Sequence, residues 1–480
     1  MWSMQSPKQK ILIITPHYSP AIRPRAFRWT TVAEKLVQRG HEVQVLCSKH
    51  ITRKGGPEVM NGVRIYRAGY NSLKEIYYHL FAVGKRRGAV RPVWQEEVAA
   101  ALDNAQEQTG GISRFLRTFE PVAKNNRVSW LNRFLLWFNN TFWRSIYWPD
   151  DASVWYFTAL RKADALWKKA GPFDTVISVS LPFTSHWVTK KLREKYAFKW
   201  IVDIGDPFFL QQEYPVNNPF WYKKRNFRCE KEVLGASDSI SVTNEVVKEA
   251  YIHTFGIGAG KIHVIPPVSG PVATPESDGL RTRVKKIKKD QPEKLIHIGY
   301  FGSFFTKIRT PKDFLDLVER WFTLMPEYRN RVQLHFFGDI FEEFLSLFDA
   351  YPGLKNNIHL YGLVPRETVP VFMESMDILL NIGNQSNLHL PSKSADYIRS
   401  GKPILHFSYF TSDTFFDSIR GQSRCFTVDF SEGRIAETKI REMAAFVEAP
   451  GEEIQAVLSS APDELRNDAE EVVDRYEGLL

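Results

Sequence analysis

Several residues suited to binding an anionic ligand follow one strand-like run in the second half of the chain. The segment LPSKSADYIRSGKPIL, residues 390–405, comes directly after the apolar run DILLNIG and a polar loop. Pro391 suits the first turn of a helix, because its missing N–H would be unpaired there. A helix that begins at the carboxyl end of a strand offers free amides to an anion. Lys393 would add a full charge, and Asp396 could bind sugar hydroxyls. A structural role is also open, with Ser392 capping the helix and Lys393 solvated.

A second loop in the same half has a related composition. In GYFGSFFTKIRTPKDF, residues 299–314, an apolar run ends at Gly302, and a loop with Lys307 and Arg309 follows. Glycine lets the backbone approach a ligand closely, and an arginine can contact two phosphate oxygens at once. Surface loops also carry solvated cations. The predicted position, at the same sheet edge as Lys393, favours an anion site.

Three segments of the first half also leave the ends of strand-like runs. PHYSPAIRPRAFRW carries Arg25 and Arg28, VSLPFTSHW brings His186 to a helix start, and WIVDIGDPF brings Asp203 and Asp206. A lone histidine is more often a satisfied polar residue than a functional one. Ligands of open α/β sheets bind at the carboxyl ends of the strands, so this location favours a functional His186.

The elements that would position these residues form two series of strands alternating with helices. Near-continuous apolar strands of this kind predict parallel sheets covered on both faces. The expected strands lie at 10–15, 40–48, 62–68, 173–180, 198–205, 237–243 and 261–266, then at 294–302, 331–339, 356–364, 377–383, 402–407 and 423–430. The alternation stops between them in a turn-rich, basic stretch. We therefore expect a first α/β domain at 1–267, a linker at 268–293, a second α/β domain at 294–438 and a helical segment at 439–480.

Residues 72–150 fit neither series. They are rich in Trp, Phe and Arg, and Trp130, Phe134, Trp137 and Phe138 recur at helical spacing. A basic, aromatic amphipathic segment can lie in a membrane interface. It can also be an inserted subdomain whose aromatic side chains pack against the first domain. The sequence leaves both readings open.

Composition narrows the classes of function. The 480 residues carry a net charge of +10, with 43% hydrophobic and 14% aromatic residues. This balance suits an anionic partner, either nucleotide phosphates or a lipid surface, and no nucleic-acid recognition motif is present. The sequence contains no P-loop, GxSxG, HExxH, GxGxxG or clustered Cys/His pattern. We expect no cofactor and no metal. The start of the chain has no signal-peptide core and no apolar run spans a bilayer, so we expect a cytoplasmic protein.

Together these segments resemble the family 4 glycosyltransferases, whose two-domain architecture is called GT-B. The resemblance spans nearly the whole chain apart from residues 72–150. It rests on KILIITPHYSP and FRWTTVAEKLVQRGHEVQVL, on PDDASVW, FDTVISVSLPFTSHWVTKKL and WIVDIGDPF, and on LPSKSADYIRSGKPIL. The chain looks closest to the branch with a DFRDPW-like segment and an LPSKxxEY helix. The resemblance implies an α/β fold of two Rossmann-like, doubly wound parallel-sheet domains facing across a cleft, with C-terminal helices.

The resemblance also implies a reaction. A sugar would pass from a nucleotide-diphosphate donor to a glycan or lipid-linked acceptor, with retained anomeric configuration and without an essential metal. Arg309 and Lys393 would neutralise the leaving diphosphate, with Lys307 as a further candidate. Asp396 would take the role of the ribose-binding carboxylate, and His186 would face the donor sugar. The second domain, 294–438, would hold the nucleotide sugar and the first domain, 1–267, would hold the acceptor. The loop after the first strand would close on both. Surface polysaccharide or glycolipid synthesis is the implied setting, with peripheral membrane contact if residues 72–150 bind lipid.

The chain departs from the family pattern at three places. A glutamate pair separated by seven residues is replaced here by Leu388 and Asp396. Ile204 and Gly205 stand where the branch has Phe-Arg, which removes a cation from that edge. The loop after the first strand reads IRPRAF, where many relatives have glycines. These departures keep open the alternative of a non-catalytic nucleotide-sugar-binding protein. The two-domain architecture itself keeps open a second alternative, a nucleotide-sugar epimerase of the same fold.

Overall fold

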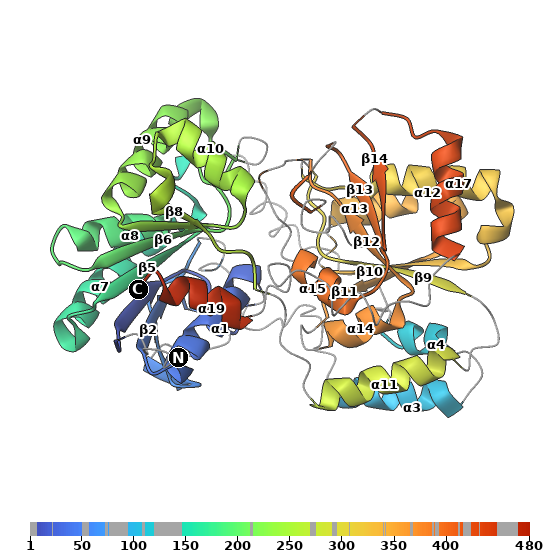
Figure 1. The fold of residues 1–480 in the computed structure, drawn as a ribbon, viewed down its shortest axis with the longest axis horizontal. Coiled ribbons are helices and arrows are strands. Elements are labelled where there is room, and N and C mark those ends of the chain that lie inside the picture. The colour runs from blue at the N-terminus through green and yellow to red at the C-terminus, as the bar shows by residue number, and fades with distance from the viewer. Residues whose placement is uncertain are drawn as a thin grey trace, which may run out of the picture. The chain divides into compact units, whose positions relative to one another are not determined.

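Two compact units make up the chain in the computed structural model (Figure 1). Unit 1 contains Met1–Arg87, Arg127–Val268 and Asn467–Leu480, and unit 2 contains Gly88–Asn126 and Ser269–Arg466. The structure describes residues 7–21, 23–49, 57–72, 75, 95–107, 111–119, 146–211, 215–268, 275–289, 295–306, 308–338, 340, 342–364, 368–385, 388, 393–410, 413–415, 424–431, 433–448 and 469–480.

Unit 1 is built on an eight-stranded sheet in the order β3-β4-β2-β1-β5-β6-β7-β8. Its strands are β1 (Lys10–Ile14), β2 (Glu42–Cys47), β3 (Pro57–Met60), β4 (Val63–Arg67), β5 (Thr175–Ser180), β6 (Lys199–Ile204), β7 (Ser239–Val242) and β8 (Ile262–Val264). All neighbours are parallel except β3 and β4. The strand order reverses between β1 and β5, and open α/β sheets commonly bind ligands at such a switch point.

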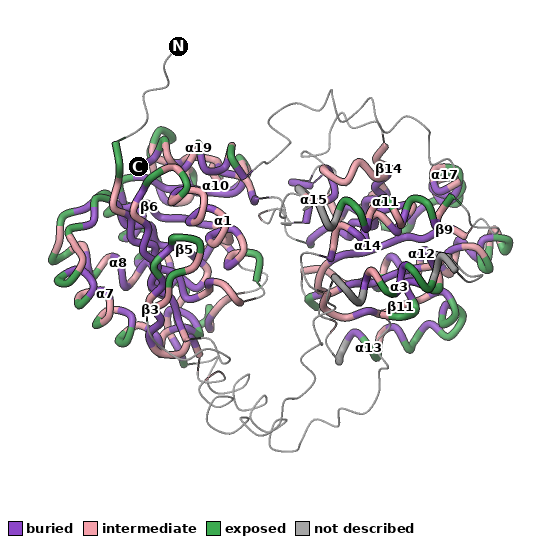
Figure 2. The backbone as a smooth tube through the Cα atoms, turned by 90° about the horizontal axis from the view of Figure 1, so that it is seen from below, coloured by how far each residue is buried: buried purple, intermediate pink, exposed green. Residues whose placement is uncertain are grey.

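Helices cover both faces of this sheet. They are α1 (Pro24–Gln38), α7 (Tyr156–Ala170), α8 (Thr184–Arg193), α9 (Pro219–Ala236), α10 (Glu245–Phe255) and α19 (Ala469–Glu477), with single turns η2 (Asp151–Trp155) and η3 (Ala259–Lys261). On one face, Trp29 of α1 and Tyr476 of α19 join a core with Ile11, Ile13 and Ile177 of the strands. Figure 2 shows the resulting pattern of buried strands and helices with exposed outer faces.

Unit 2 is built on a six-stranded sheet, fully parallel, in the order β11-β10-β9-β12-β13-β14. Its strands are β9 (Ile296–Phe301), β10 (Val332–Phe337), β11 (Ile358–Gly362), β12 (Ile378–Ile382), β13 (Ile404–Ser408) and β14 (Cys425–Asp429). Its helical elements are α3 (Gln95–Glu107), α4 (Gly111–Arg117), α11 (Pro275–Lys289), α12 (Lys312–Leu324), η4 (Pro326–Tyr328), α13 (Glu342–Asp349), η5 (Pro352–Leu354), α14 (Val369–Ser375), α15 (Lys393–Ser400) and α17 (Glu437–Glu448). The switch in strand order lies between β9 and β12.

The predicted fold class is confirmed: the chain forms two Rossmann-like α/β units, and each predicted strand is present. The alternating pattern missed only β3, whose short sequence PEVM is antiparallel and lies at the sheet edge. Near-continuous apolar runs are a strong signal because a strand buried on both faces admits few polar residues.

The boundaries of the units differ from the predicted domains at two places. The stretch expected to be a linker contains α11, whose Leu280, Val284 and Ile287 are buried in a core of unit 2. Helices α3 and α4, from the stretch expected to be an insertion of the first domain, join the same core. The three buried residues of α11 follow helical spacing, a signal that the many surrounding lysines obscured. The stretch 120–145, which contains the aromatic stripe, lies outside the described residues.

The C-terminal helix α19 packs on unit 1 rather than continuing unit 2. Val472, Val473 and Tyr476 lie in the core of unit 1 beside α1. Lys35 of α1 and Arg39, which directly follows this helix, form ion pairs with Glu470. Unit 1 is therefore completed by residues that follow the whole of unit 2 in the chain.

Candidate functional site

Two cations meet around one tyrosine at the switch point of unit 2. Arg309 follows β9 and donates from Nη1 to the Tyr300 hydroxyl at 3.2 Å and from Nε to Asn384 Oδ1 at 3.1 Å. Lys393 opens α15, and its Nζ lies 4.0 Å from the centre of the Tyr300 ring. The structure thus brings together the two residues that the sequence pointed to from different loops.

Lys393 is buried without a hydrogen-bond partner. Its residue is 8% exposed, and Nζ contacts no acceptor among the described residues. Burial, followed by the charge of Arg309, holds the pKa of this amine well below its usual range. An isolated buried ammonium is unfavourable, so the position favours an anionic ligand that would supply the missing partner.

The backbone around these cations is held by Tyr397, which lies one turn after Lys393 on α15. Its hydroxyl accepts from the Phe301 amide at 2.9 Å and donates to the Leu380 carbonyl at 3.0 Å. This side chain connects α15 to β9 and β12. The segment DYIR gave no separate signal for that role, because an aromatic residue on a helix is usually only core.

Glycines end the strands beside the two cations. Gly302 has φ +155° and Gly338 has φ +144°, and a Cβ at Gly338 would lie 2.1 Å from the Gly302 carbonyl oxygen. A Cβ at Gly302 would lie 3.6 Å from Arg309 Nη1. Both positions require glycine, because residues with a side chain rarely adopt these φ values. Gly302 was predicted, whereas Gly338 was missed.

The remaining candidates of unit 2 are only partly described. Asp396 is half-buried on α15, and Leu388 is half-buried in a turn before it. Lys307, Pro391 and Ser392 lie outside the described residues. The carboxylate of Asp396 is therefore placed on the same helix as Lys393.

In unit 1, His186 lies in the first turn of α8, after β5. The residue is 1% exposed. Trp200 Nε1 donates to Ser178 Oγ at 2.8 Å, and this hydroxyl lies 2.7 Å from His186 Nδ1. The Ser178 hydroxyl can donate its proton to Nδ1, and in that tautomer the neutral ring carries its own proton on Nε2. His186 Nε2 is buried and has no partner among the described residues, so in that tautomer it is an unused donor.

A buried carboxylate holds the start of α8. Asp150 accepts from the Thr184 amide at 3.0 Å, from the Thr184 hydroxyl at 2.7 Å and from the Ala152 amide at 3.0 Å. Burial, followed by the charge of Asp151, raises the pKa of Asp150 to about 7. The position of His186 therefore depends on Asp150, which the PDDASVW segment contains but which spacing alone did not single out.

Acidification should destabilise unit 1 through His186. Burial lowers the pKa of His186 to about 3, whereas an unfolded histidine titrates near 6.5. Between these values the unfolded chain binds more protons, so stability falls as pH falls. From pH 7 to pH 5 the wild type should lose about 2 kcal/mol more than a His186→Gln variant. Denaturant unfolding of unit 1 at both pH values measures this difference, and identical pH dependence of the two proteins would contradict it.

Arg25 lies at the edge of unit 1 where Ile204 and Gly205 stand in place of the Phe-Arg of the family pattern. Its guanidinium pairs with Asp206 and lies against Gly205, where a Cβ would be 2.2 Å from Nη1. A larger residue at Gly205 would displace it. Arg25 Nη1 is buried without a partner among the described residues. A cation therefore lies at this edge of unit 1, on α1, a helix that begins at Pro24.

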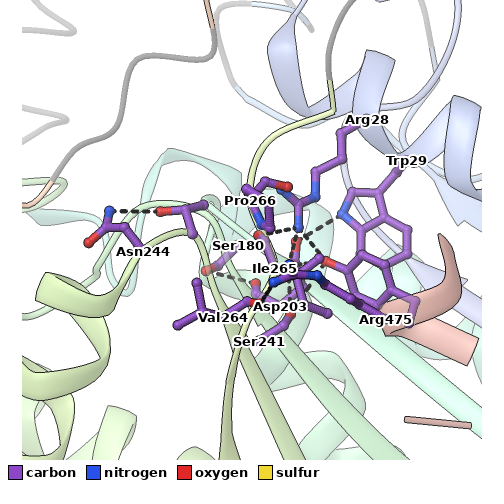
Figure 3. Close-up of polar contacts among 12 residues, drawn as sticks. Arg28, Trp29, Ser180, Asp203, Ser241, Asn244, Val264, Ile265, Pro266 and Arg475 are labelled. Atoms are coloured by element: carbon purple, nitrogen blue, oxygen red, sulfur yellow. Dashed lines mark hydrogen bonds and ion pairs between the residues drawn. The ribbon is translucent and has the colours of Figure 1, made fainter. Parts of the chain in front are cut away.

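Arg28 lies in a different environment (Figure 3). Its guanidinium donates to the carbonyls of Ile265 and Pro266, at 3.0 and 2.9 Å, and to the Tyr476 hydroxyl at 2.6 Å. It also lies 3.8 Å from Asp203. These contacts connect α1 to α19, so we assign Arg28 a structural role and keep only Arg25 and Asp206 as acceptor-side candidates.

Two further findings concern the described residues. They contain no group of three or more His, Cys, Asp or Glu side chains placed to hold a metal ion. None of their helices combines the length and apolarity that crossing a bilayer requires.

No protein-family model and no curated protein matches the chain, but solved structures do. WaaG, a glycosyltransferase involved in lipopolysaccharide biosynthesis, superposes with a TM-score of 0.57 at 11% identity, over 97% of this chain and 98% of WaaG. The catalytic domain of starch synthase IV from Arabidopsis thaliana, bound to ADP and acarbose, gives 0.57 at 9% identity over 98% of each chain. HepE from Anabaena, in complex with UDP and glucose, gives 0.53 at 10% identity over 98% of each chain. At these identities the similarity shows the fold, which is GT-B.

Proposed function

We propose that this chain is a glycosyltransferase that moves a sugar from a nucleotide-diphosphate donor to a glycan or lipid-linked acceptor. The observation that supports this most directly is the meeting of Arg309 and Lys393 around Tyr300, with Lys393 Nζ buried and unpaired. Breaking the anomeric bond places negative charge on the departing diphosphate. Cations that are already in position stabilise such charge as it develops. Two cations at one strand edge also suit a reaction without an essential metal.

We propose further roles for residues of each unit. The neutral ring of His186 offers a donor to a hydroxyl of the transferred sugar, and Asp396 would accept hydrogen bonds from the ribose. Arg25 would contact the acceptor. We propose retention of the anomeric configuration, by a route in which the acceptor enters on the face that the diphosphate leaves and no protein nucleophile is needed. The solved structures with UDP and ADP support a nucleotide donor by similarity of fold.

Incubation with radiolabelled UDP-, GDP- and dTDP-sugars, with and without glycan and lipid-linked acceptors, tests the proposal. We expect one donor to bind and its label to move to an acceptor, with the anomeric configuration of the product read by NMR. Conversion of the donor sugar without an acceptor would identify an epimerase instead. Absence of binding by every donor would contradict the proposal.

One observation favours a second candidate, a non-catalytic nucleotide-sugar-binding protein. Leu388, at the position of the first family glutamate, is half-buried and cannot accept a hydrogen bond from a donor sugar. In that case a donor would bind without turnover across all acceptors. A Leu388→Glu variant separates the two candidates, because restored turnover would show that only this carboxylate was missing.

Nucleotide binding should take up a proton at Lys393. The free amine has a lowered pKa because of burial and Arg309, and a bound diphosphate would raise that pKa again. Affinity for a nucleoside diphosphate should therefore fall as the pH rises above the pKa of the free amine. Calorimetry in buffers of different ionisation enthalpy measures the uptake, and Lys393→Met should abolish it. Equal uptake by the variant would assign the proton to another group.

A further inference from the structure

The exposed start of α9 combines large aromatic side chains with basic ones. Phe220 is 91% exposed and Trp221 is 72% exposed. Lys223, Lys224, Arg225 and Arg228 on the same helix are also exposed. We call these six residues, with the 61% exposed Ile146 beside them, the α9 patch. Soluble monomers rarely leave aromatic side chains this exposed without an interaction to use them.

The α9 patch sits on a firmly anchored part of the fold. The Asn218 side chain caps α9 by accepting from the Phe220 amide at 3.1 Å, and the Tyr222 hydroxyl donates to the Ile146 carbonyl at 2.9 Å. Behind the patch, Asn226 accepts from Trp148 Nε1 at 3.0 Å. The two aromatic side chains thus project from a fixed helix, and little ordering would be required when they bind.

The charge of the α9 patch indicates which kind of partner it binds. From Pro219 to Cys229 the helix carries four cations and no acidic residue, and the next carboxylate, Glu230, is 1% exposed. Lysine is depleted in protein–protein interfaces. Tryptophan and phenylalanine beside lysine and arginine suit the headgroup region of an anionic membrane. The arrangement is therefore complementary to lipid phosphates with acyl chains beneath them.

We propose that the α9 patch docks unit 1 onto an anionic lipid bilayer, with Phe220, Trp221 and Ile146 at the headgroup level and the four cations on lipid phosphates. Its residues are not those of the aromatic stripe at 130–138 that the sequence suggested for membrane contact. A docked unit 1 would meet a lipid-linked acceptor at the surface that presents it. Docking itself does not require transfer chemistry.

Vesicle flotation with the full chain tests the docking. The wild type should bind vesicles containing phosphatidylglycerol and should bind phosphatidylcholine vesicles much less. It should dissociate from the vesicles as the salt concentration rises from about 0.1 M to about 1 M, because the screening length falls to about 3 Å at the higher concentration. Each cation near an anionic surface contributes about fivefold to binding. Lys223→Glu/Lys224→Glu should therefore weaken binding at least about 25-fold, and Phe220→Ser/Trp221→Ser should weaken it at any salt concentration.

Matched controls separate the patch from general charge and apolarity. Lys286→Glu/Lys355→Glu changes exposed residues of unit 2 and lowers the net charge of +10 by the same four units. Phe157→Ser removes an aromatic residue of α7 that is 71% exposed. Both controls should bind as the wild type does, and circular dichroism confirms that every variant is folded.

Three results would overturn the proposal. The first is no vesicle binding by the wild type, and the second is an equal loss of vesicle binding in the controls and the patch variants. The third is a wild-type dimer in sedimentation that binds no vesicles and that only Phe220→Ser/Trp221→Ser dissociates. Donor binding is measured separately on the same proteins. Vesicle binding without donor binding would support the docking and count against the glycosyltransferase, and the reverse result would do the opposite.

Discussion

Replacing Lys393 with methionine should abolish sugar transfer and at the same time make unit 2 more stable. Loss of one preorganised group that stabilises developing charge lowers turnover about a hundredfold or more. Methionine fills a similar volume without burying an amine that lacks a partner. Removal of such an unsatisfied polar group is worth about 1–3 kcal/mol, partly offset by the lost contact with the Tyr300 ring. The melting temperature should rise by a few degrees.

Arg309→Ala gives the contrasting result. It should lower turnover to a similar extent, but it leaves the Tyr300 hydroxyl and Asn384 without their donor, so unit 2 should become slightly less stable. Lys355→Met, at an exposed position of the same unit, serves as the control and should change neither property. Steady-state kinetics with the identified donor and thermal unfolding measure both effects. A destabilised Lys393→Met protein with normal turnover would show that the amine has a structural role only.

Replacing Asp203 with alanine should disrupt the packing of α19 against the rest of unit 1. The carboxylate is 2% exposed and accepts from Trp29 Nε1 at 2.9 Å, the Ser241 hydroxyl at 2.8 Å and the Tyr476 hydroxyl at 2.7 Å (Figure 3). It also compensates the nearby guanidinium of Arg28. Removing one partner of a buried pair leaves an uncompensated charge and costs about 3–5 kcal/mol.

Hydrogen exchange followed by mass spectrometry resolves this effect by segment. In Asp203→Ala, α19 and α1 should lose protection while unit 2 keeps its own. Asp474→Asn is a matched control on the same helix, because it removes an exposed pair with Arg39 and should cost less than about 1 kcal/mol. The double variant Arg28→Ala/Asp203→Ala should lose less than the sum of the single variants. Full protection of α19 in Asp203→Ala would contradict the assigned role.

The fold could be predicted because its signal is local. Each parallel strand is a short apolar run that sterics and burial restrict to few residue types, and the helices between them follow from spacing. The choice of Arg309 and Lys393 also rested on position, since both follow strands that meet at one sheet edge. Their contact through Tyr300 could not be predicted, because a tyrosine inside a strand is usually interpreted as a residue of the hydrophobic core.

Arg25 and Arg28 show why the rest could not be read. The two arginines carry the same charge and lie three residues apart in one segment. What distinguishes them is the contact of Arg28 with Tyr476, which lies 448 residues further along the chain. This contact gives Arg28 a structural role and leaves Arg25 as the acceptor-side candidate. The helix start at Pro24 was a readable sign that both belong to α1. No local pattern indicates that a distant segment returns to cover one of them.

The return of α19 to unit 1 has a consequence for synthesis on the ribosome. Domains of a nascent chain generally begin to fold in the order in which they emerge, and unit 1 emerges first. Its helix α19 is translated only after all of unit 2, so until then Asp203 and Arg28 lack Tyr476 and the apolar face of α1 is uncovered. Unit 1 is therefore the first part of the protein to begin folding and the last to finish, and its α1 face stays uncovered by α19 while unit 2 is translated.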